Sequence, residues 1–374
     1  MKAFFNYFTD PVYSFTFVCI AFFFMIKYVH IVATMKFGIG LMISTVIMFV
    51  LCFMDPVFTA NFQMTNDNIP IIFLVLLLAW TTWFSLYKGV NNDKRIAQGL
   101  PPIEGTPENR EKVWAWPNLV YTELFAIILG TIFLIAWSVF FKAPLEEPAN
   151  PTWAPNPAKA PWYFLGLQEM LVYFDPWLAG VVLPGLIIVG LIAIPYIDMN
   201  PKGNGYYTFA ERKFAIITYL FSWLVLWNFL IIIGTVFRGP NWSFYGPFEV
   251  WDAHKVVAEN NINISEIFWI NTLGMNPPTN IILREIIGIL MTLAYIVCLP
   301  IFLTKKIFNF NGLFGKIVNG GFLGQRYLKS LGWPRYALLI FLILMMLSLP
   351  IKMYLRWLFY LKYIVFMPEI EFNI

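Results

Sequence analysis

Long apolar segments constrain this chain more than any other feature of its sequence. An α-helix needs roughly 20 residues to cross the ~30 Å hydrocarbon core of a bilayer. Hydrophobic residues make up 59% of the chain and charged residues 12%, against about 25% charged in soluble proteins. The sequence therefore predicts an all-α, polytopic membrane protein with about eight transmembrane helices. They are Tyr13–Val32, Ile39–Ala60, Pro70–Tyr87, Leu119–Phe141, Leu178–Tyr196, Phe214–Val236, Ile286–Leu303 and Tyr336–Leu349.

Shorter helices are expected on the membrane surface. A short aromatic helix after Pro161 is too short to cross the bilayer and is expected at the outer face. Near the end of the chain, Pro350 is expected to break the eighth segment, after which Lys352, Arg356 and Lys362 recur among aromatic residues. Because this pattern suits a helix lying in the head-group region, we expect a C-terminal interfacial helix.

The distribution of lysine and arginine predicts the orientation, since these residues concentrate in cytoplasmic loops. If the N-terminus lies outside, 16 of the 25 basic residues fall in inner loops and turns. Both termini and the 143–173 stretch then lie on the outer side. The net charge of +4 is small and spread over separate loops, so no nucleic-acid partner is expected.

Potential metal ligands are scarce. Cys19, Cys52 and Cys298 lie in separate apolar segments and form no CxxC pattern, so we interpret them as small buried hydrophobic residues. The two histidines, His30 and His254, are predicted on opposite sides of the membrane and cannot share one haem iron. The sequence therefore predicts that this chain ligates no metal.

The stretch from Ala143 to Tyr173 is the best candidate for chemistry. Six prolines between Pro144 and Pro161 predict an extended linker, and a short apolar helix follows. Glu169 lies seven residues after Trp162, so both should project from one face about 10 Å apart. A carboxylate beside aromatic rings suits a site that binds an apolar ring and accepts its protons. The alternative is a surface helix with a solvated Glu169.

This stretch resembles the C-terminal part of cytochrome b, which is the separate subunit IV in photosynthetic bf complexes. Residues 147–151, EPANP, look like the subunit IV segment EPADP, and residues 160–163, APWY, fall where the family carries PEWY. The frame of one helix, an outer linker, a short helix and two further helices runs from about Trp114 to Val236. The AWPNL segment and the basic aromatic tail look like long C-terminal cytochrome b subunits of bacterial quinol:cytochrome c oxidoreductases.

The resemblance implies a subunit of a bc-type complex that oxidises quinol at the outer, positive side and releases protons. The expected partners are a cytochrome b N-terminal subunit carrying both b haems, a Rieske iron–sulfur protein and a c-type cytochrome subunit. The quinone, expected to be menaquinone, binds at a site shared with those partners, and no complete redox centre is expected in this chain alone. The expected assembly is a dimeric complex in the bacterial inner membrane.

One departure from the family concerns the proton acceptor. Pro161 stands where the family has the glutamate of its motif, while Trp162 and Tyr163 match. The predicted quinol-binding residues are Pro161, Trp162, Tyr163 and Phe164. The predicted catalytic residues are Tyr163 and Glu169, with Glu169 as proton acceptor and Glu146 or Glu147 as its less favoured substitutes.

Three regions are expected: an N-terminal three-helix extension with its inner loop (1–110), a cytochrome b C-terminal domain (111–240), and an outer loop with two helices and the interfacial tail (241–374). An alternative function is a non-catalytic membrane anchor of another respiratory complex. A solute transporter is disfavoured because ionisable groups within the spans are few, with Glu123, Asp55 and Glu285 near helix ends.

Overall fold

The computed structural model describes residues 2–63, 68–109, 112–140, 148–200, 206–258, 260–304 and 325–374. The chain divides into two compact units. The first unit contains Met1–Ile26, Lys159–Lys202 and Phe214–Ile374. The second unit contains Lys27–Ala158 and Gly203–Lys213. Each unit is described by itself.

The protein is all-α and carries several helices that suit a membrane. Among the described residues, six helices are long and apolar enough to cross a bilayer, namely Met35–Phe53, Phe73–Ala97, Ala115–Phe140, Leu178–Ile197, Phe209–Phe237 and Tyr327–Phe359. A seventh span is possible if α1 (Lys2–Phe8) and α2 (Pro11–Lys27), bent by 77°, act as one. The stretch Ile286–Ile301 is a shorter apolar helix. This confirms the predicted class of an all-α, polytopic membrane protein.

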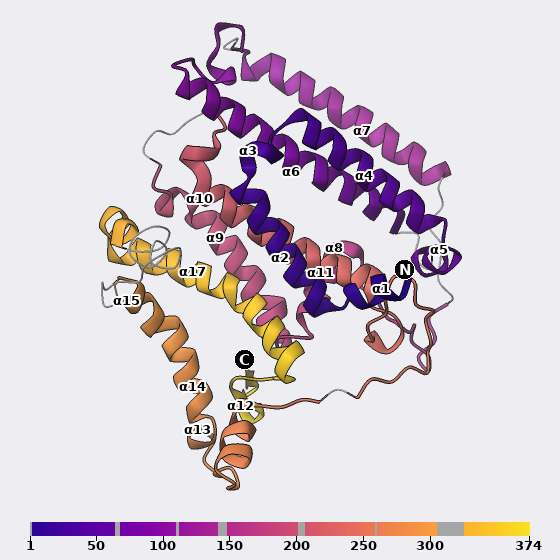
Figure 1. Ribbon diagram of the computed structural model, residues 1–374, viewed down its shortest axis with the longest axis vertical. Coiled ribbons are helices and arrows are strands. Elements are labelled where there is room, and N and C mark those ends of the chain that lie inside the picture. The colour runs from indigo at the N-terminus through magenta and orange to yellow at the C-terminus, as the bar shows by residue number, and fades with distance from the viewer. Residues whose placement is uncertain are drawn as a thin grey trace. The chain divides into compact units, whose positions relative to one another are not determined.

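The first unit holds most of the described helices (Figure 1). After α1 and α2 it contains α8 (Trp162–Met170), η4 (Leu178–Val182) and α9 (Leu183–Ile197). The next span begins with α10 (Phe209–Leu220), which belongs to this unit from Phe214 onward, and continues through η5 (Phe221–Trp227), α11 (Asn228–Ile232) and η6 (Ile233–Phe237). The loop after this span carries η7 (Pro240–Trp242), α12 (Ile264–Glu266), η8 (Ile267–Thr272) and α13 (Ile281–Arg284). The chain continues as α14 (Ile286–Leu293), η9 (Ala294–Cys298), α15 (Leu299–Thr304) and α17 (Gln325–Phe359).

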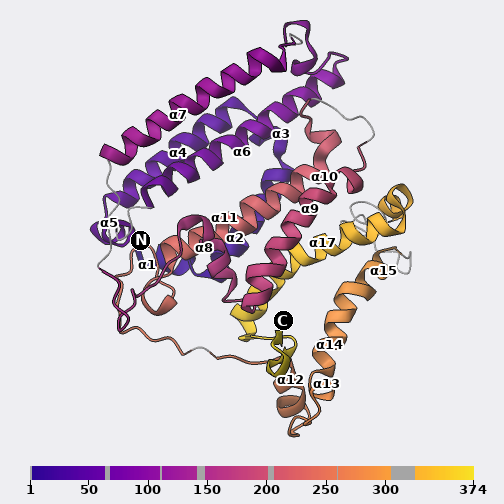
Figure 2. The same cartoon turned by 180° about the vertical axis from the view of Figure 1, so that it is seen from behind.

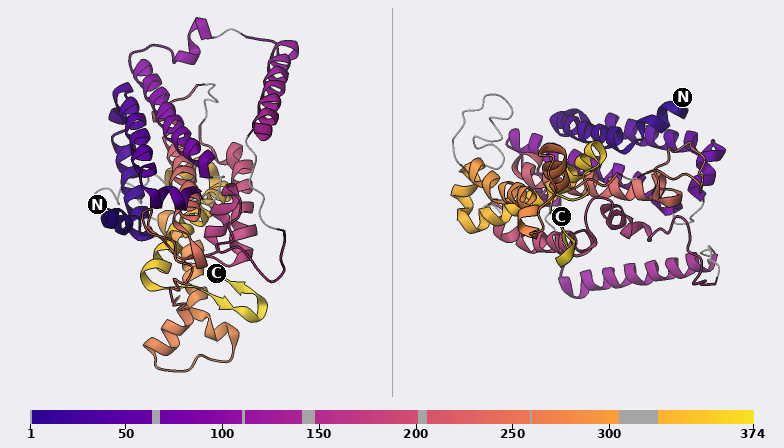
Figure 3. Two further views of the ribbon diagram at one scale, coloured as in Figure 1. Left: turned by 90° about the vertical axis from the view of Figure 1, so that its right-hand side faces the viewer. Right: turned by 90° about the horizontal axis from the view of Figure 1, so that it is seen from below.

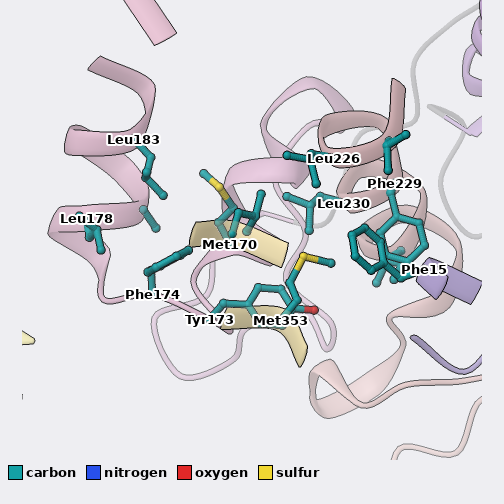
Figure 4. Packing of buried hydrophobic residues seen from close by; sticks show 14 residues of the cluster. Phe15, Met170, Tyr173, Phe174, Leu178, Leu183, Leu226, Phe229, Leu230 and Met353 are labelled. Atoms are coloured by element: carbon teal, nitrogen blue, oxygen red, sulfur yellow. The ribbon is translucent and has the colours of Figure 1, made fainter. Parts of the chain in front are cut away.

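A buried cluster joins the helices of the first unit around α8 and α11 (Figure 4). The ring of Phe15 from α2 lies 4.9 Å from that of Phe229. Met170 and Tyr173 from the end of α8 meet Met353 of α17 in the same cluster. Residues that are far apart in the sequence thus form one core, which fixes the position of α8 (Figures 2 and 4).

The C-terminal part of α17 differs from the expectation. Pro350 lies inside the helix, which continues to Phe359, so the predicted break at Leu349-Pro350 is wrong. A proline removes one intrahelical hydrogen bond but does not always end a helix. Here burial of Leu349 and Met353 in the core holds the helix together on both sides of Pro350. The chain then forms the antiparallel pair of β1 (Phe366–Met367) and β2 (Phe372–Asn373), with η11 (Pro368–Ile370) between them (Figure 3).

The second unit contains α3 (Val29–Val32), α4 (Met35–Phe53), α5 (Pro56–Gln63) and α6 (Asn68–Ala97), in which α4 and α6 lie side by side (Figure 1). The predicted segment Ile39–Ala60 is divided between α4 and α5. The division follows from Asp55, whose carboxylate accepts hydrogen bonds from the amides of Val57 and Phe58 and so caps α5, while Pro56 suits its first turn.

Polar contacts close the loop that follows α6. Asn92, which is fully buried, donates hydrogen bonds to Glu104 at 2.7 Å and to the carbonyl of Tyr207 at 2.9 Å. Its side-chain oxygen accepts from the amide of Ile103. This loop holds η1 (Ile103–Gly105) and η2 (Pro107–Asn109).

The helix before the proline-rich linker consists of η3 (Ala115–Leu119) and α7 (Val120–Phe140). No residue of α7 is buried, although its sequence is mostly apolar, with Glu123 as its one charged residue. An apolar helix without a buried face suits an environment of lipid or of another membrane subunit.

Candidate functional site

The short helix α8 begins directly after Pro161 and is fixed by its own side chains. The amide of Phe164 donates to the carbonyl of Pro161 at 2.8 Å, which closes the first turn. Gln168, from the second half of the helix, reaches back and accepts a hydrogen bond from the amide of Ala160 at 2.9 Å. The end of the linker is thereby attached to α8.

The two faces of α8 differ in chemistry. Leu165, Gly166, Glu169 and Met170 are buried, with Glu169 fully inaccessible. The exposed fractions of Tyr163 and Phe164 are 50% and 52%, and Trp162 is partly buried. The three aromatic rings follow one another, with ring centroids 5.7 Å apart for Trp162 and Tyr163 and 4.7 Å apart for Tyr163 and Phe164. The sequence-predicted aromatic residues therefore gather at one end of α8, and the predicted carboxylate lies in its buried face.

Glu169 forms a two-pronged ion pair with Arg238. The guanidinium Nε donates to one carboxylate oxygen at 3.0 Å, and Nη2 donates to the other at 2.7 Å. The hydroxyl of Tyr173 donates to the second oxygen at 3.1 Å. Burial raises the pKa of Tyr173 well above its usual value, and the charge of Glu169 adds to this rise. The alternative of a solvated Glu169 is wrong, because the residue is 0% exposed.

Arg238 comes from the loop that follows η6, 69 residues after Glu169. Its Nη1 donates to the carbonyl of Trp242 at 2.8 Å, and its backbone forms a bridge with Phe244. Arg238 is not among the site residues predicted from the sequence. The available signal was its position directly after an apolar span, at the predicted level of the short helix.

Lys159 lies beside this ion pair, three residues before α8. Its Nζ donates to the carbonyl of Thr235 at 2.7 Å and lies 5.1 Å from the centre of a Trp251 ring. Burial and, to a smaller extent, the charge of Arg238 lower the pKa of Lys159 to about 8, against the opposing charge of Glu169. Sequence reasoning did not single out Lys159 as a site residue.

Close packing places α8 against the span that ends in Arg238. Gly234, in η6, lies against the side chain and carbonyl of Leu165, and Gly166, in α8, faces Trp227 and Ile231. Small residues on both elements let the two backbones approach each other, as in other helix pairs within membranes. This approach brings Glu169 and Arg238 into contact.

Metal ligands do not gather in the described part of the chain. Those residues contain no group of three histidine, cysteine, aspartate or glutamate side chains that could hold a metal ion. His30 lies in α3 of the second unit, and His254 lies in the loop between η7 and α12 of the first. The alternative carboxylates Glu146 and Glu147 lie outside the described residues.

Comparison with known proteins finds similarity in the region that contains α8. Residues 148–247 match the family described as cytochrome b (C-terminal)/b6/petD. A similar protein is the menaquinol:cytochrome c reductase cytochrome c subunit of Geobacillus thermodenitrificans, which is 32% identical over 95 residues. That match covers 23% of this chain and 37% of the relative, so the chain spans little more than a third of the relative's length. No solved structure matches the chain. Residues 148–247, which contain α8, Glu169 and Arg238, are thus similar to the cytochrome b C-terminal family.

Proposed function

We propose that this chain is a subunit of a bc-type quinol:cytochrome c oxidoreductase and that α8 forms part of its quinol-oxidation pocket. The observation that carries the proposal is the family match over 148–247, a region in which aromatic side chains stand above a buried, ion-paired carboxylate. The name of the Geobacillus relative, a menaquinol:cytochrome c reductase subunit, supports the same reaction class.

The proposed quinol-binding wall consists of Pro161, Trp162, Tyr163 and Phe164. Tyr163 and Phe164 are half exposed at the end of α8, where their rings are free to contact a flat apolar ring. Aromatic rings pair in stacked or edge-to-face arrangements at centroid separations of about 4.5–7 Å, and a quinol ring can join such an arrangement. The hydroxyl of Tyr163 is a donor and acceptor suited to a quinol oxygen.

Glu169 is the proposed proton acceptor on this side of the pocket. It is the carboxylate within α8, and it lies in the buried face of that helix rather than in solvent. Three hydrogen bonds from Arg238 and Tyr173 occupy its two carboxylate oxygens. Proton uptake by Glu169 therefore requires that Arg238 move away from at least one carboxylate oxygen during turnover.

The partners supply the redox centres in this proposal. They are a haem-carrying cytochrome b N-terminal subunit, a Rieske iron–sulfur protein and a c-type cytochrome, which together accept the two electrons of the quinol. The quinone is menaquinone, the complex is dimeric and lies in the bacterial inner membrane, and both termini of this chain face the outer side. The residues of this chain contribute ring binding and proton transfer.

Glu169→Gln tests the proposal in the purified complex. We expect quinol:cytochrome c turnover to fall by about tenfold to a hundredfold, because a positioned acid–base group typically contributes a factor of ~10² or more. The pH dependence of turnover should change as well. Glu249→Gln is the matched control, since Glu249 is an outer-loop carboxylate paired with Lys255. Near-normal turnover with an unchanged pH profile in Glu169→Gln would exclude the proposed role of Glu169.

Turnover of the variants is compared at equal amounts of assembled complex, which haem spectra and subunit content determine. A wild-type complex that contains this chain but no b-type haem would contradict the proposed function as a whole. That result would favour the alternative of a non-catalytic anchor subunit.

A further inference from the structure

The surroundings of Glu169 hold more positive than negative charge. Lys159 and Arg238 both interact with Glu169, and each raises the energetic cost of the other's charge. The guanidinium already occupies both oxygens of Glu169. Among the described residues, Lys159 forms no direct ion pair, and its hydrogen bond goes to a backbone carbonyl. The positive charge of its ammonium form is therefore only partly balanced by Glu169. The neutral amine form leaves the site without excess charge.

Two residues that contact Lys159 each carry a buried polar side-chain atom without a hydrogen-bond partner within the described residues. These atoms are the hydroxyl of Thr235 and the indole Nε1 of Trp251. Both belong to residues that contact Lys159, through the Thr235 carbonyl and the Trp251 ring. Thr235 is only 4% exposed. A hydroxyl, an indole N–H and an amine are the donors and acceptors that hold a bound water in a protein interior.

We propose that Lys159 is a second proton-carrying group of the site, which takes a proton from the quinol side as a neutral amine and releases it to the outer surface as an ammonium. This inference rests on the proposed function. Oxidation of one quinol to quinone releases two protons and two electrons. The electrons pass to the iron–sulfur and haem centres of the partner subunits. One proton is assigned to Glu169 and the other to the lone pair of the Lys159 amine.

The position of Lys159 suits this task. Its backbone is attached to α8 through the hydrogen bond between Ala160 and Gln168, and its side chain reaches the end of η6. The amine therefore lies between the aromatic helix and the outer loop that carries Trp251. Because its pKa is about 8, both of its forms are populated at neutral to mildly alkaline pH.

The charge of Glu169 couples the two groups. Ionised Glu169 raises the pKa of Lys159, so it favours the ammonium form. When Glu169 takes up a proton, this attraction ends, and the charge of Arg238 then favours release of the proton from Lys159. Tyr173, the other titratable group on Glu169, has a raised pKa and stays neutral. Proton uptake by Glu169 thus promotes proton release by Lys159.

Lys159→Met and Lys159→Arg in the assembled complex test this inference. Methionine keeps the apolar stem but carries no proton, and arginine keeps the positive charge but does not give up its proton in proteins. We expect both variants to lose turnover by about tenfold or more, as for other proton-transfer groups. We also expect the turnover of the wild-type complex to rise as pH increases through about 8, and both variants to lack this rise.

Arginine separates proton transfer from a structural role, because a charge needed only for anchoring would be restored by it. Wild-type turnover and pH profile in Lys159→Arg, or in Lys159→Met, would overturn the inference while leaving the proposed function intact. Lys255→Met is the matched control, since Lys255 also lies over an aromatic ring, that of Tyr245 at 4.2 Å, but is paired with Glu249.

Two further measurements keep the inference testable if a variant does not assemble. If Lys159→Met yields no complex, Lys159→Arg decides alone. If neither assembles, the wild-type profile decides, because a flat dependence of turnover between pH 7 and pH 9 contradicts a titrating group at this position. A wild-type complex without any quinol:cytochrome c activity would instead refute the proposed function itself.

Discussion

At the scale of single residues, the ion pair of Glu169 and Arg238 is the most constrained feature of the site. The side chain of Glu169 is fully buried, and that of Arg238 is 11% exposed. Removing two charges from water is costly, and a buried pair is stable only when its geometry and hydrogen bonds compensate for that cost. The two bonds from Arg238 and the one from Tyr173 supply that compensation.

Arg238→Met tests how strongly the fold depends on this pair. The substitution leaves Glu169 as a buried, unpaired charge, which typically costs about 3–5 kcal/mol. We expect a lower midpoint of thermal unfolding for the purified complex. The double variant with Glu169→Gln should regain part of the loss, because it removes the uncompensated charge. Stability losses that simply add in the double variant would show that the two residues are not coupled.

At the scale of elements, glycine residues determine how closely the helices approach. In the second unit, Gly38 of α4 lies directly against the ring of Trp83 in α6, and a methyl group at this position would overlap that ring. The Trp83 indole is held in place, since its Nε1 donates to the carbonyl of Thr34 at 3.2 Å. The pairing of α4 with α6 therefore requires glycine at position 38.

Gly38→Ala should destabilise this helix pair, with Gly40→Ala as its control. Overfilling a packed contact typically costs about 1–3 kcal/mol. Gly40 lies in the same helix, but a methyl group there meets no atom within 4 Å. We expect the thermal unfolding midpoint to fall for Gly38→Ala and to stay near the wild-type value for Gly40→Ala. Equal midpoints for the two variants would contradict the packing shown between Gly38 and Trp83.

At the scale of the whole molecule, the placement of basic residues remains the basis for the predicted orientation. The structure gives helices that suit a membrane, but the side on which each loop lies is a prediction from the lysine and arginine count. The proposed function requires α8 and the loop around Arg238 on the outer side, where quinol oxidation releases protons. A test of the orientation is therefore also a test of the proposed function.

Cysteine labelling in intact cells tests this orientation. In a background with Cys19, Cys52 and Cys298 replaced by alanine, we expect Val256→Cys to react with a membrane-impermeant maleimide. Val256 is 82% exposed in the outer loop. Glu108→Cys, in the exposed loop after α6, should react only after the membrane is opened. The reverse pattern would place α8 on the inner face and contradict the proposed site.

The sequence by itself determined the fold class and the location of the candidate site. Apolar length predicts membrane helices because it depends only on neighbouring residues and on bilayer thickness, and the same local pattern indicated the short helix after Pro161. Helix ends were predicted less well. A cap at Asp55 starts a new helix inside one predicted segment, and burial in the core keeps the helix around Pro350 intact.

Only the tertiary structure decided the partners within the site. Arg238 lies 69 residues from Glu169, and the carbonyl of Thr235 lies 76 residues from Lys159. A helical repeat shows which residues share a face, but it does not show which distant residue meets that face. That choice depends on how α8 packs against the span ending in η6, where Gly234 and Gly166 allow close approach. The burial that results gives Glu169 its ion pair and lowers the pKa of Lys159.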